Sequence, residues 1–587
     1  MTRVAGDGDL RRTSDREEVR APCGQAALDQ WCTDPLTQGD SLDADATRVW
    51  RRTTMRCARM NAVLALVTLT VVAASSPAMG QATGGDKTLI MAIDQSEAKT
   101  LDPARGFEFM SFFVDGNTYD TLIAHKGAND LNTFVPMLAT EWKVSAHGKE
   151  YTFKLRPNVK FASGNPFTAE DVKFSLMRLK NIKGNPSFIM DPLKEVVVID
   201  PVTVKTTLNE PFADWLPALA GPGSGIMDSK LAKEHGASDS PTANKDDTAE
   251  EWLNQNSAGS GPFILRSWQK SNVIIMERNP NYLRGPAKIA RVEARDVASA
   301  ATQKLVIENG DVDVALNLTP DLTATMRNNK NVKIVLGQSL DNIYMGMTVD
   351  PALHPELAKK EVRQAIRHAV DRNGIIKLTN GRAVIGPAVF SIGVLGLETQ
   401  ADADKLNPKF DLKLAKDLLA KAGVPNGFKF PLKYPTGPSP AGIPYESLAQ
   451  KVQADLKKIG VEVQLIPLEF GVMITQYRAK TEIAVIGPNA PDYIGPSDWA
   501  GQMVLHTWAP RLRWDDPKAK EMTRKADAEL DPKRRSAMYK ELLAYLVENG
   551  PYVNLVQPRV EVAVRPNITG YEYFPLGAVR LYPVVKN

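Results

Sequence analysis

Apolar residues follow two spacings along this chain, one typical of strands and one typical of helices. Tyr151, Phe153 and Leu155 are apolar at every second position, which predicts a strand with one buried face. Between Val362 and Val370, apolar residues recur at intervals of three and four, which predicts a helix with one buried face. The two patterns alternate along most of the chain, and this order predicts an α/β fold.

Capping and turn residues place several of these elements. Thr168 precedes a helical pattern and Asp171 follows three positions later, so we expect a helix from about Ala169. The strongly apolar stretch Asn342–Met347 predicts a buried strand. Near the C-terminus we expect a helix over about 532–548, followed by two strands at Tyr552–Leu555 and Val560–Val564.

The first 82 residues differ from the rest of the chain. Residues 1–54 are polar and lack clear periodicity, so we expect a disordered extension or a start codon assigned too far upstream. Arg56 and Arg59 then precede the apolar run 62–74, and small residues follow up to Ala82. This order predicts a signal peptide over residues 55–82, cut after Ala82 or, as the alternative, after Gly80. A single membrane anchor is the alternative, although the run is shorter than the ~20 residues that span a bilayer.

Cysteine, charge and histidine narrow the class of protein. Cys23, Cys32 and Cys57 all precede the predicted cut, so the exported chain has no disulfide and no cysteine for lipid attachment. The net charge is only +4 over 587 residues and no basic tract stands out, which argues against nucleic-acid binding. The six histidines form no close pair and no H-E-x-x-H pattern, so we expect no metal site and no cofactor.

Three segments occur in an order that resembles one family. They are Gly164–Val172 (GNPFTAEDV), Gly259–Phe263 (GSGPF) and Val362–Ile375 (VRQAIRHAVDRNGI). Together they resemble the periplasmic solute-binding proteins of the peptide and nickel ABC importers, that is, the oligopeptide- and dipeptide-binding type of extracellular solute-binding family 5. The resemblance extends over nearly all of residues 87–585.

The resemblance implies a particular division of the chain. We expect a two-lobed periplasmic-binding-protein fold of type II, with lobes joined by two hinge strands near Asn342–Met347 and Tyr552–Leu555. Lobe I would take residues 83–341 and would be enlarged by an extra subdomain. Lobe II would take residues 342–552, and residues 553–587 would return to lobe I.

The resemblance also implies a function. A periplasmic monomer would capture a peptide or peptide-like small solute by closing its lobes, and deliver it to an inner-membrane ABC permease with ATPase subunits. No G-x-S-x-G motif or other catalytic motif stands out, so we expect no enzyme and no catalytic residues. Two alternatives stay open. One is a carrier of a metal chelate, haem, opine or sugar derivative on the same fold, and the other is a secreted hydrolase.

The candidate ligand residues lie in one loop, Asn489–Trp499 (NAPDYIGPSDW), after an apolar strand. The resemblance implies that an aspartate here pairs with the ammonium group of a ligand, with Asp492 as first choice and Asp498 as second. Tyr493 and Trp499 would then wall the pocket through apolar and cation–π contact. An ordinary solvated loop is the alternative, and a hydrolase would use the two acids as an acid–base pair.

Two further positions follow from the resemblance. Phe107 and Glu108 lie after a Leu-Asp-Pro segment, where family members contact their ligand, so we carry both as candidates. Dipeptide-binding members carry an arginine before the helix at Ser447, where it meets the ligand carboxylate. Residues 439–447 contain no basic residue here, so longer peptides, amino-acid derivatives, opines or amine-bearing sugars are as plausible as dipeptides.

Overall fold

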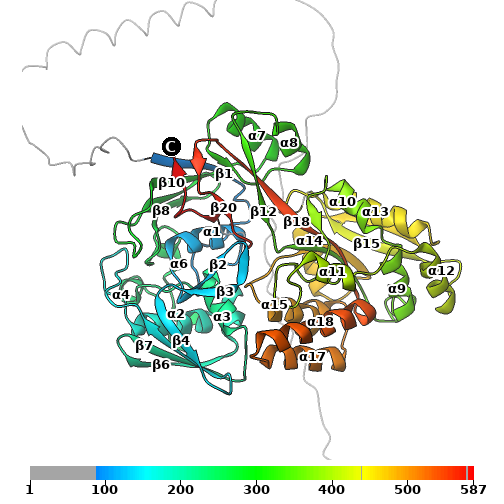
Figure 1. Ribbon diagram of the computed structural model, residues 1–587, viewed down its shortest axis with the longest axis horizontal. Helices are drawn as coiled ribbons and strands as arrows, with labels where there is room; N and C mark the ends of the chain where they lie inside the picture. The colour runs from blue at the N-terminus through cyan, green and yellow to red at the C-terminus, as the bar shows by residue number, and fades with distance from the viewer. Residues whose placement is uncertain (1–86, 438, 440, 577–578) are drawn as a thin grey trace, which may run out of the picture. The chain divides into compact units, whose positions relative to one another are not determined.

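The computed structural model describes residues 87–587, apart from 438, 440, 577 and 578. The predicted extension 1–54 and the signal peptide 55–82 therefore lie outside the described residues. Strands and helices alternate through the described chain, as expected for an α/β protein (Figure 1). In this part of the chain, no helix has both the length and the apolar character needed to cross a bilayer.

A mixed sheet of twelve strands runs through the fold. Ten strands follow the order β16-β15-β17-β13-β18-β11-β1-β10-β9-β8, and β12 and β14 also pair with β18. The bounds are β1 (Lys87–Ile93), β8 (Phe263–Gln269), β9 (Val273–Arg278), β10 (Ile289–Asp296), β11 (Val314–Ala315), β12 (Lys333–Gln338), β13 (Asn342–Met347), β14 (Ala383–Val384), β15 (Lys429–Pro435), β16 (Glu462–Leu468), β17 (Ala484–Asn489) and β18 (Tyr552–Val564).

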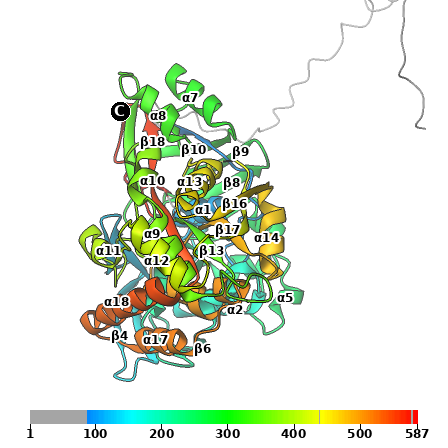
Figure 2. The same ribbon diagram turned by 90° about the vertical axis from the view of Figure 1, so that its right-hand side faces the viewer.

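The long strand β18 joins the two ends of this sheet. Its first half pairs with β13, and its second half pairs with β11 and β12. Figures 1 and 2 show β18 crossing the middle of the fold, with α8 beside one end. The expectation of two separate C-terminal strands was wrong, because β18 continues through Pro558, which pairs with Ala383. Proline lacks the amide proton but tolerates extended backbone, so it does not have to end a strand.

A separate antiparallel sheet has the order β4-β5-β7-β6, with bounds β4 (Ala139–Val144), β5 (Glu150–Leu155), β6 (Leu193–Asp200) and β7 (Thr203–Leu208). The predicted alternation is confirmed, because Tyr151, Phe153 and Leu155 of β5 are all buried. Helix α2 (Ala169–Ile182) packs on this sheet. It begins where predicted, since the Asp171 carboxylate accepts a hydrogen bond from the Thr168 amide at 2.8 Å.

The remaining strands form three two-stranded pairs, β2 (Ile123–Gly127) with β3 (Asp130–Pro136), β19 (Ile568–Thr569) with β22 (Val585–Lys586), and β20 (Glu572–Tyr573) with β21 (Val579–Arg580). The other α-helices are α1 (Phe109–Thr118), α3 (Trp215–Ala220), α4 (Ser229–Glu234), α5 (Ala243–Asp246), α6 (Glu250–Leu253), α7 (Ala300–Asn309), α8 (Pro320–Met326), α9 (Lys360–Ala369), α10 (Arg372–Leu378), α11 (Gln400–Leu406), α12 (Leu412–Lys421), α13 (Tyr445–Lys457), α14 (Phe470–Arg478), α15 (Pro496–Ala500), α16 (Trp508–Arg511), α17 (Pro517–Ala528) and α18 (Pro532–Asn549). A π-helical turn, Gly501–Leu505, follows α15 directly.

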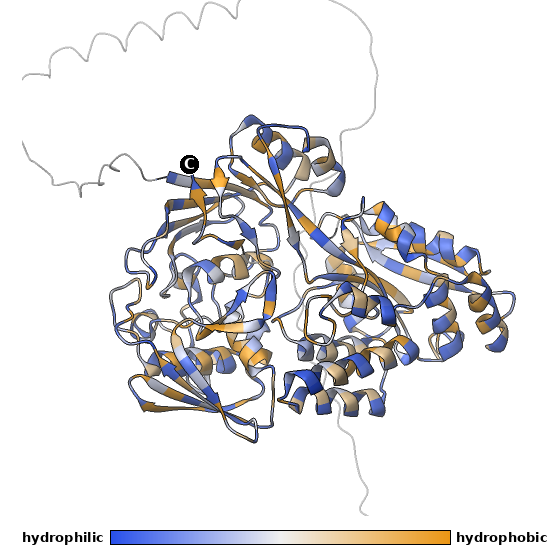
Figure 3. Cartoon of the chain, viewed as in Figure 1, coloured by the Kyte–Doolittle hydropathy of each residue, from blue (hydrophilic) through white to orange (hydrophobic). Residues whose placement is uncertain are grey.

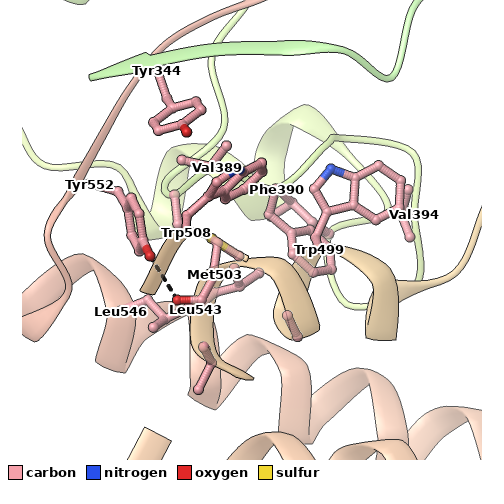
Figure 4. Close-up of a cluster of buried hydrophobic side chains, with 14 of the residues drawn as sticks. Tyr344, Val389, Phe390, Val394, Trp499, Met503, Trp508, Leu543, Leu546 and Tyr552 are labelled. Atoms are coloured by element: carbon pink, nitrogen blue, oxygen red, sulfur yellow. Dashed lines mark hydrogen bonds between the residues drawn. The ribbon is translucent and has the colours of Figure 1, made fainter. Parts of the chain in front are cut away.

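Two buried clusters matter for the site. The subdomain cluster gathers side chains of the antiparallel sheet, α2 and α3, among them Phe153 and Trp215. The aromatic cluster gathers side chains from β13, β18 and α15–α18, among them Tyr344, Trp508 and Tyr552 (Figure 4). Blue and orange positions alternate along α9, α12 and α18 in Figure 3, as expected for helices with one buried face.

Candidate functional site

The candidate loop follows the carboxyl end of a strand in a parallel set. Strands β15, β16 and β17 run parallel, and β17 ends at Asn489. Ligands of open α/β sheets bind beyond the carboxyl ends of such strands, because the loops there converge on one edge. The loop that carries Asp492 and Asp498 is therefore at the edge where a ligand site is expected.

Asp492 and Asp498, predicted as first and second choice for one role, lie close together in the structure. The Asp492 amide donates a hydrogen bond to Asp498 Oδ2 at 3.0 Å. Gln502 Nε2 donates to both oxygens of Asp498, at 3.1 and 3.2 Å, and lies 3.4 Å from Asp492 Oδ2. In the described part of the chain, no lysine, arginine or histidine is seen to pair with either carboxylate. Among the described residues, the pair therefore has amide donors but no cationic partner.

Burial and mutual repulsion change the titration of this pair. Burial raises the pKa of Asp498 to about 7. Burial also raises the pKa of Asp492 well above its ordinary value, and the nearby Asp498 charge raises it further. Two close carboxylates titrate as a unit and keep a proton into the neutral range unless a cation joins them. The arrangement is suited to bind a cation such as an ammonium group.

Tyr493 and Trp499 hold the loop from two different sides. Tyr493 is buried in the subdomain cluster, whereas Trp499 is fully buried in the aromatic cluster. The rings of Trp499 and Phe390 lie 5.6 Å apart at 39° (Figure 4). The indole Nε1–H of Trp499 has no hydrogen-bond partner among the described residues. The structure thus places both aromatic rings as anchors of the acidic loop, and their contact with a ligand stays a prediction.

Phe107 and Glu108 stand at the start of α1. Glu108 is the residue before the helix, and its carboxylate accepts a hydrogen bond from the Phe107 amide at 3.1 Å. The Phe107 ring makes edge-on contacts with Phe112 and Phe188, each with centroids 5.7 Å apart. Phe107 packs against the same subdomain cluster that contains Tyr493. Phe107 and Tyr493 therefore share one buried cluster, and the structure gives no direct contact of Phe107 or Glu108 with the acidic loop.

The sequence analysis did not single out the glycine loop 221–225. A Cβ on Gly221 would lie 3.8 Å from Cβ of Tyr493, and a Cβ on Gly223 would lie 4.0 Å from the Phe112 ring. This loop therefore lies between the aromatic residues of α1 and the acidic loop. The density of glycine in Gly-Pro-Gly-Ser-Gly was the signal, because glycine allows close approach of backbone to a ligand. Gln502 was also missed, although it lies four residues after Asp498.

A second group of acids lies at the carboxyl end of β1. Burial raises the pKa of Glu97, and the neighbouring charges of Asp94 and Glu108 raise it further. Lys99 lies 3.7 Å from Glu108 and is largely exposed. Acidic groups thus outnumber basic ones here as well.

Measurable cavities occur elsewhere on the protein. One of about 340 Å³ is lined by Arg105, Asp247 and Glu250, and another of about 340 Å³ by Gln364, Arg367 and His368. Neither is lined by a predicted ligand residue, so the chemistry of the acid pair is the stronger guide to the site. Among the described residues, no three His, Cys, Asp or Glu side chains are placed to hold a metal ion.

Comparison with known proteins finds relatives that match most of the chain. The model of the bacterial extracellular solute-binding proteins, family 5 middle region, matches residues 133–510. The chain is 27% identical over 507 residues to the probable D,D-dipeptide-binding periplasmic protein of Escherichia coli (strain K12), which covers 84% of this chain and 92% of the relative. It is 27% identical over 512 residues to Di/tripeptide-binding protein 2 of Pseudomonas aeruginosa (strain UCBPP-PA14), with 81% and 91% covered.

Solved structures show the same fold. HbpA2 from Haemophilus parasuis matches with a TM-score of 0.71 at 25% identity, over 85% of this chain and 100% of that chain. The periplasmic binding protein DppA from Helicobacter pylori, in complex with the peptide STSA, matches with a TM-score of 0.69 at 23% identity, over 86% and 98%. These matches confirm the expected two-lobed α/β fold. Because the family model covers more than half of the chain, the protein belongs to family 5 of the bacterial extracellular solute-binding proteins.

Proposed function

We propose that this protein captures a peptide or peptide-like solute outside the cytoplasmic membrane and holds its ammonium group at the Asp492–Asp498 pair. The observation that carries this proposal is a buried pair of carboxylates with no cationic partner among the described residues. An ammonium group would supply the missing positive charge and up to three hydrogen-bond donors. Relatives named for dipeptides, di- and tripeptides and glutathione support a solute of this kind.

The solute would be enclosed by hinge closure. The predicted lobes, 83–341 with 553–587 and 342–552, meet where β13 pairs with β18, and the two strands would carry the hinge. The solute would stabilise the closed arrangement by its higher affinity for it. The closed protein, a monomer in the periplasm without a lipid anchor, would then deliver the solute to an inner-membrane ABC permease driven by ATPase subunits.

The chemical group at the end of the solute away from its ammonium group narrows the class of ligand. The residues 436–446 contain no lysine, arginine or histidine, so a free peptide carboxylate would lack a strong partner there. Structural neighbours with bound solutes include complexes with a nonapeptide and with agropinic acid. A solute whose carboxylate is absent, distant or amidated therefore fits this chain better than a free dipeptide.

Identification of the bound solute tests the proposal. The chain lacking residues 1–82 is purified, denatured and its released small molecules identified by mass spectrometry. We expect an amine-bearing solute that is recovered chemically unaltered after incubation with the refolded protein, as for a carrier without catalytic activity. Conversion of the solute to a product, or a melting temperature indifferent to a broad panel of peptides and amines, would contradict the proposal.

The affinity of such a solute is expected to depend on pH. Because the pKa of Asp498 is raised to about 7, the carboxyl must lose its proton before an ammonium group can pair with it. One displaced proton predicts a dissociation constant roughly 100-fold higher at pH 5 than at pH 8. Titration calorimetry in two buffers of different ionisation enthalpy measures both the affinity and the released proton. An affinity that stays constant over this range would exclude the pair as the ammonium site.

A further inference from the structure

A carboxylate from outside the acidic loop is bonded to that loop. Asp214 directly precedes α3 and is completely buried. Its Oδ2 atom accepts a hydrogen bond from the Ser497 amide at 2.7 Å, and its Oδ1 atom lies 2.7 Å from Arg535 Nη2. Ser497 is the residue before Asp498, so this contact reaches the acid pair through the backbone.

Several other bonds support the contact. Arg535 Nη2 donates to Ser497 Oγ at 3.0 Å, and Arg535 Nε donates to the Ala526 carbonyl at 3.2 Å. The Ala213 amide donates to the Asp527 carbonyl at 2.9 Å. A buried charge is stable only when it is paired and hydrogen-bonded. Asp214 and Arg535 are paired with each other, and both are also hydrogen-bonded.

The partners belong to different parts of the fold. Asp214 precedes α3, whose Trp215 packs in the subdomain cluster. Ser497 lies in α15 and Arg535 in α18, and both helices contribute to the aromatic cluster. Tyr493 of the acidic loop also enters the subdomain cluster. These bonds join the two predicted lobes and include no solute atom.

Gly495 shows how closely the two parts approach. A Cβ on Gly495 would lie 2.4 Å from Asp214 Oδ2, and its three nearest heavy atoms are all atoms of Asp214. The φ angle of Gly495 is −154°, which any residue adopts. Glycine is therefore required at this position by the approach of Asp214 and not by the local backbone.

We infer that Asp214, Gly495 and Arg535 form an interlobe latch, in which Asp214 is a positioning residue for the acid pair. Formation of the latch brings the lobes together and fixes the loop of Asp492 and Asp498 in its binding geometry. The latch is strong enough to maintain a measurable closed population without solute. The inference rests on the proposed function in one respect only, namely that the closed state serves to hold a solute.

A distance measurement without solute tests the latch. All cysteines precede residue 58, so two introduced cysteines in the exported chain carry the only spin labels. Lys173→Cys on α2 and Glu541→Cys on α18 are suitable, because both side chains are exposed. Gly495→Ala is the main variant, since its added methyl group clashes with Asp214. Asp214→Asn is the second variant, which removes the ion-pair partner of Arg535.

Two control variants match these changes. Gly127→Ala adds a methyl group where no heavy atom lies within 4 Å. Glu210→Gln removes a carboxylate from an exposed ion pair with Lys149. Both controls are expected to leave the distance distribution unchanged, because neither touches the latch.

Double electron–electron resonance is expected to show both a short and a long distance between the two spin labels in the parent protein. Gly495→Ala and Asp214→Asn should each lower the ratio of the short-distance population to the long-distance population by about tenfold. The double variant should lower this ratio little further than either single variant. A parent with only the long distance, or variants with the control distribution, would overturn the latch. Circular dichroism verifies folding, and Gly495→Ala decides the matter if Asp214→Asn does not fold. The labelled protein is denatured, freed of co-purifying solute and refolded before the measurement, so failure of the proposed function would not affect this result.

Discussion

Asp498→Asn is expected to weaken binding of the co-purifying solute by about 100-fold or more. Removal of one partner from a buried charge pair costs roughly 2–5 kcal/mol, and each 1.4 kcal/mol is a factor of ten in affinity. The amide side chain of this variant would keep a hydrogen-bond acceptor for the Asp492 amide, so the loop geometry should survive. Titration calorimetry at pH 8 measures the loss.

The same substitution should make the solute-free protein more stable. Below pH 3.8 the Asp498 carboxyl is protonated in the folded and unfolded chains alike, and its effect on stability is nil. As the pH rises to about 7, the unfolded chain loses this proton more readily than the folded chain, so the folded state loses stability. At 1.36 kcal/mol per pKa unit, Asp498→Asn should therefore gain up to about 4 kcal/mol of unfolding free energy at pH 8.

The opposite signs of these two effects identify a binding residue. Asp515→Asn provides the matched control, because Asp515 is exposed and pairs with Lys520. We expect that control to change neither affinity nor stability by more than about 1 kcal/mol. If Asp498→Asn lowers stability at pH 8 and leaves affinity intact, its carboxylate is structural and the proposed site is wrong.

Arg178→Met is expected to destabilise the protein by about 3–5 kcal/mol, because it leaves two buried carboxylates with only the longer 3.4 Å contacts to Arg105. Arg178 is almost completely buried on α2. Its guanidinium donates to both oxygens of Asp102 at 2.6 Å and to the two oxygens of Asp247 at 2.7 and 2.9 Å. The Asp102 of the Leu-Asp-Pro segment thus has a structural role, which the sequence did not reveal. Denaturant unfolding measures the loss.

A control and a rescue make this result specific. Lys205→Met removes the cation of the more exposed pair with Glu150 and should cost less than about 1 kcal/mol. Adding Asp102→Asn and Asp247→Asn to Arg178→Met should recover part of the stability, because neutral amides no longer need the guanidinium. A triple variant less stable than Arg178→Met would show that packing of the arginine, and not its charge, is what the fold requires.

The local elements could be read from the sequence because they depend on neighbouring residues. The box of Thr168 and Asp171 placed the start of α2, and the apolar run placed β13 at Asn342–Met347. The apolar alternation of β5 predicted its buried face. Only the break expected before Val560 failed, since the pairing partners of β18 on both sides of Pro558 are far away in the sequence.

The acidic loop was also visible in the sequence, but its geometry was not. Asp492 and Asp498 were the first and second choices, and the structure brings them together with Gln502. The contact of Trp499 with a ligand stays a prediction, and the structure buries this side chain fully against Phe390, a residue from a distant segment of the chain. Periodicity cannot reveal such a contact, because it depends on how two distant segments pack.

Local patterns were enough to establish the alternation of strands and helices, the family and the position of the acidic loop. Spacing, capping and motif order all act over a few residues, so they can be read along the chain. Only the packing of distant segments shows which groups face the acid pair. Asp214 reaches Ser497 across 283 positions, and no local pattern encodes that approach. The balance between buried carboxylates and the cations that neutralise them is set by folding, which brings distant charges to within hydrogen-bond distance.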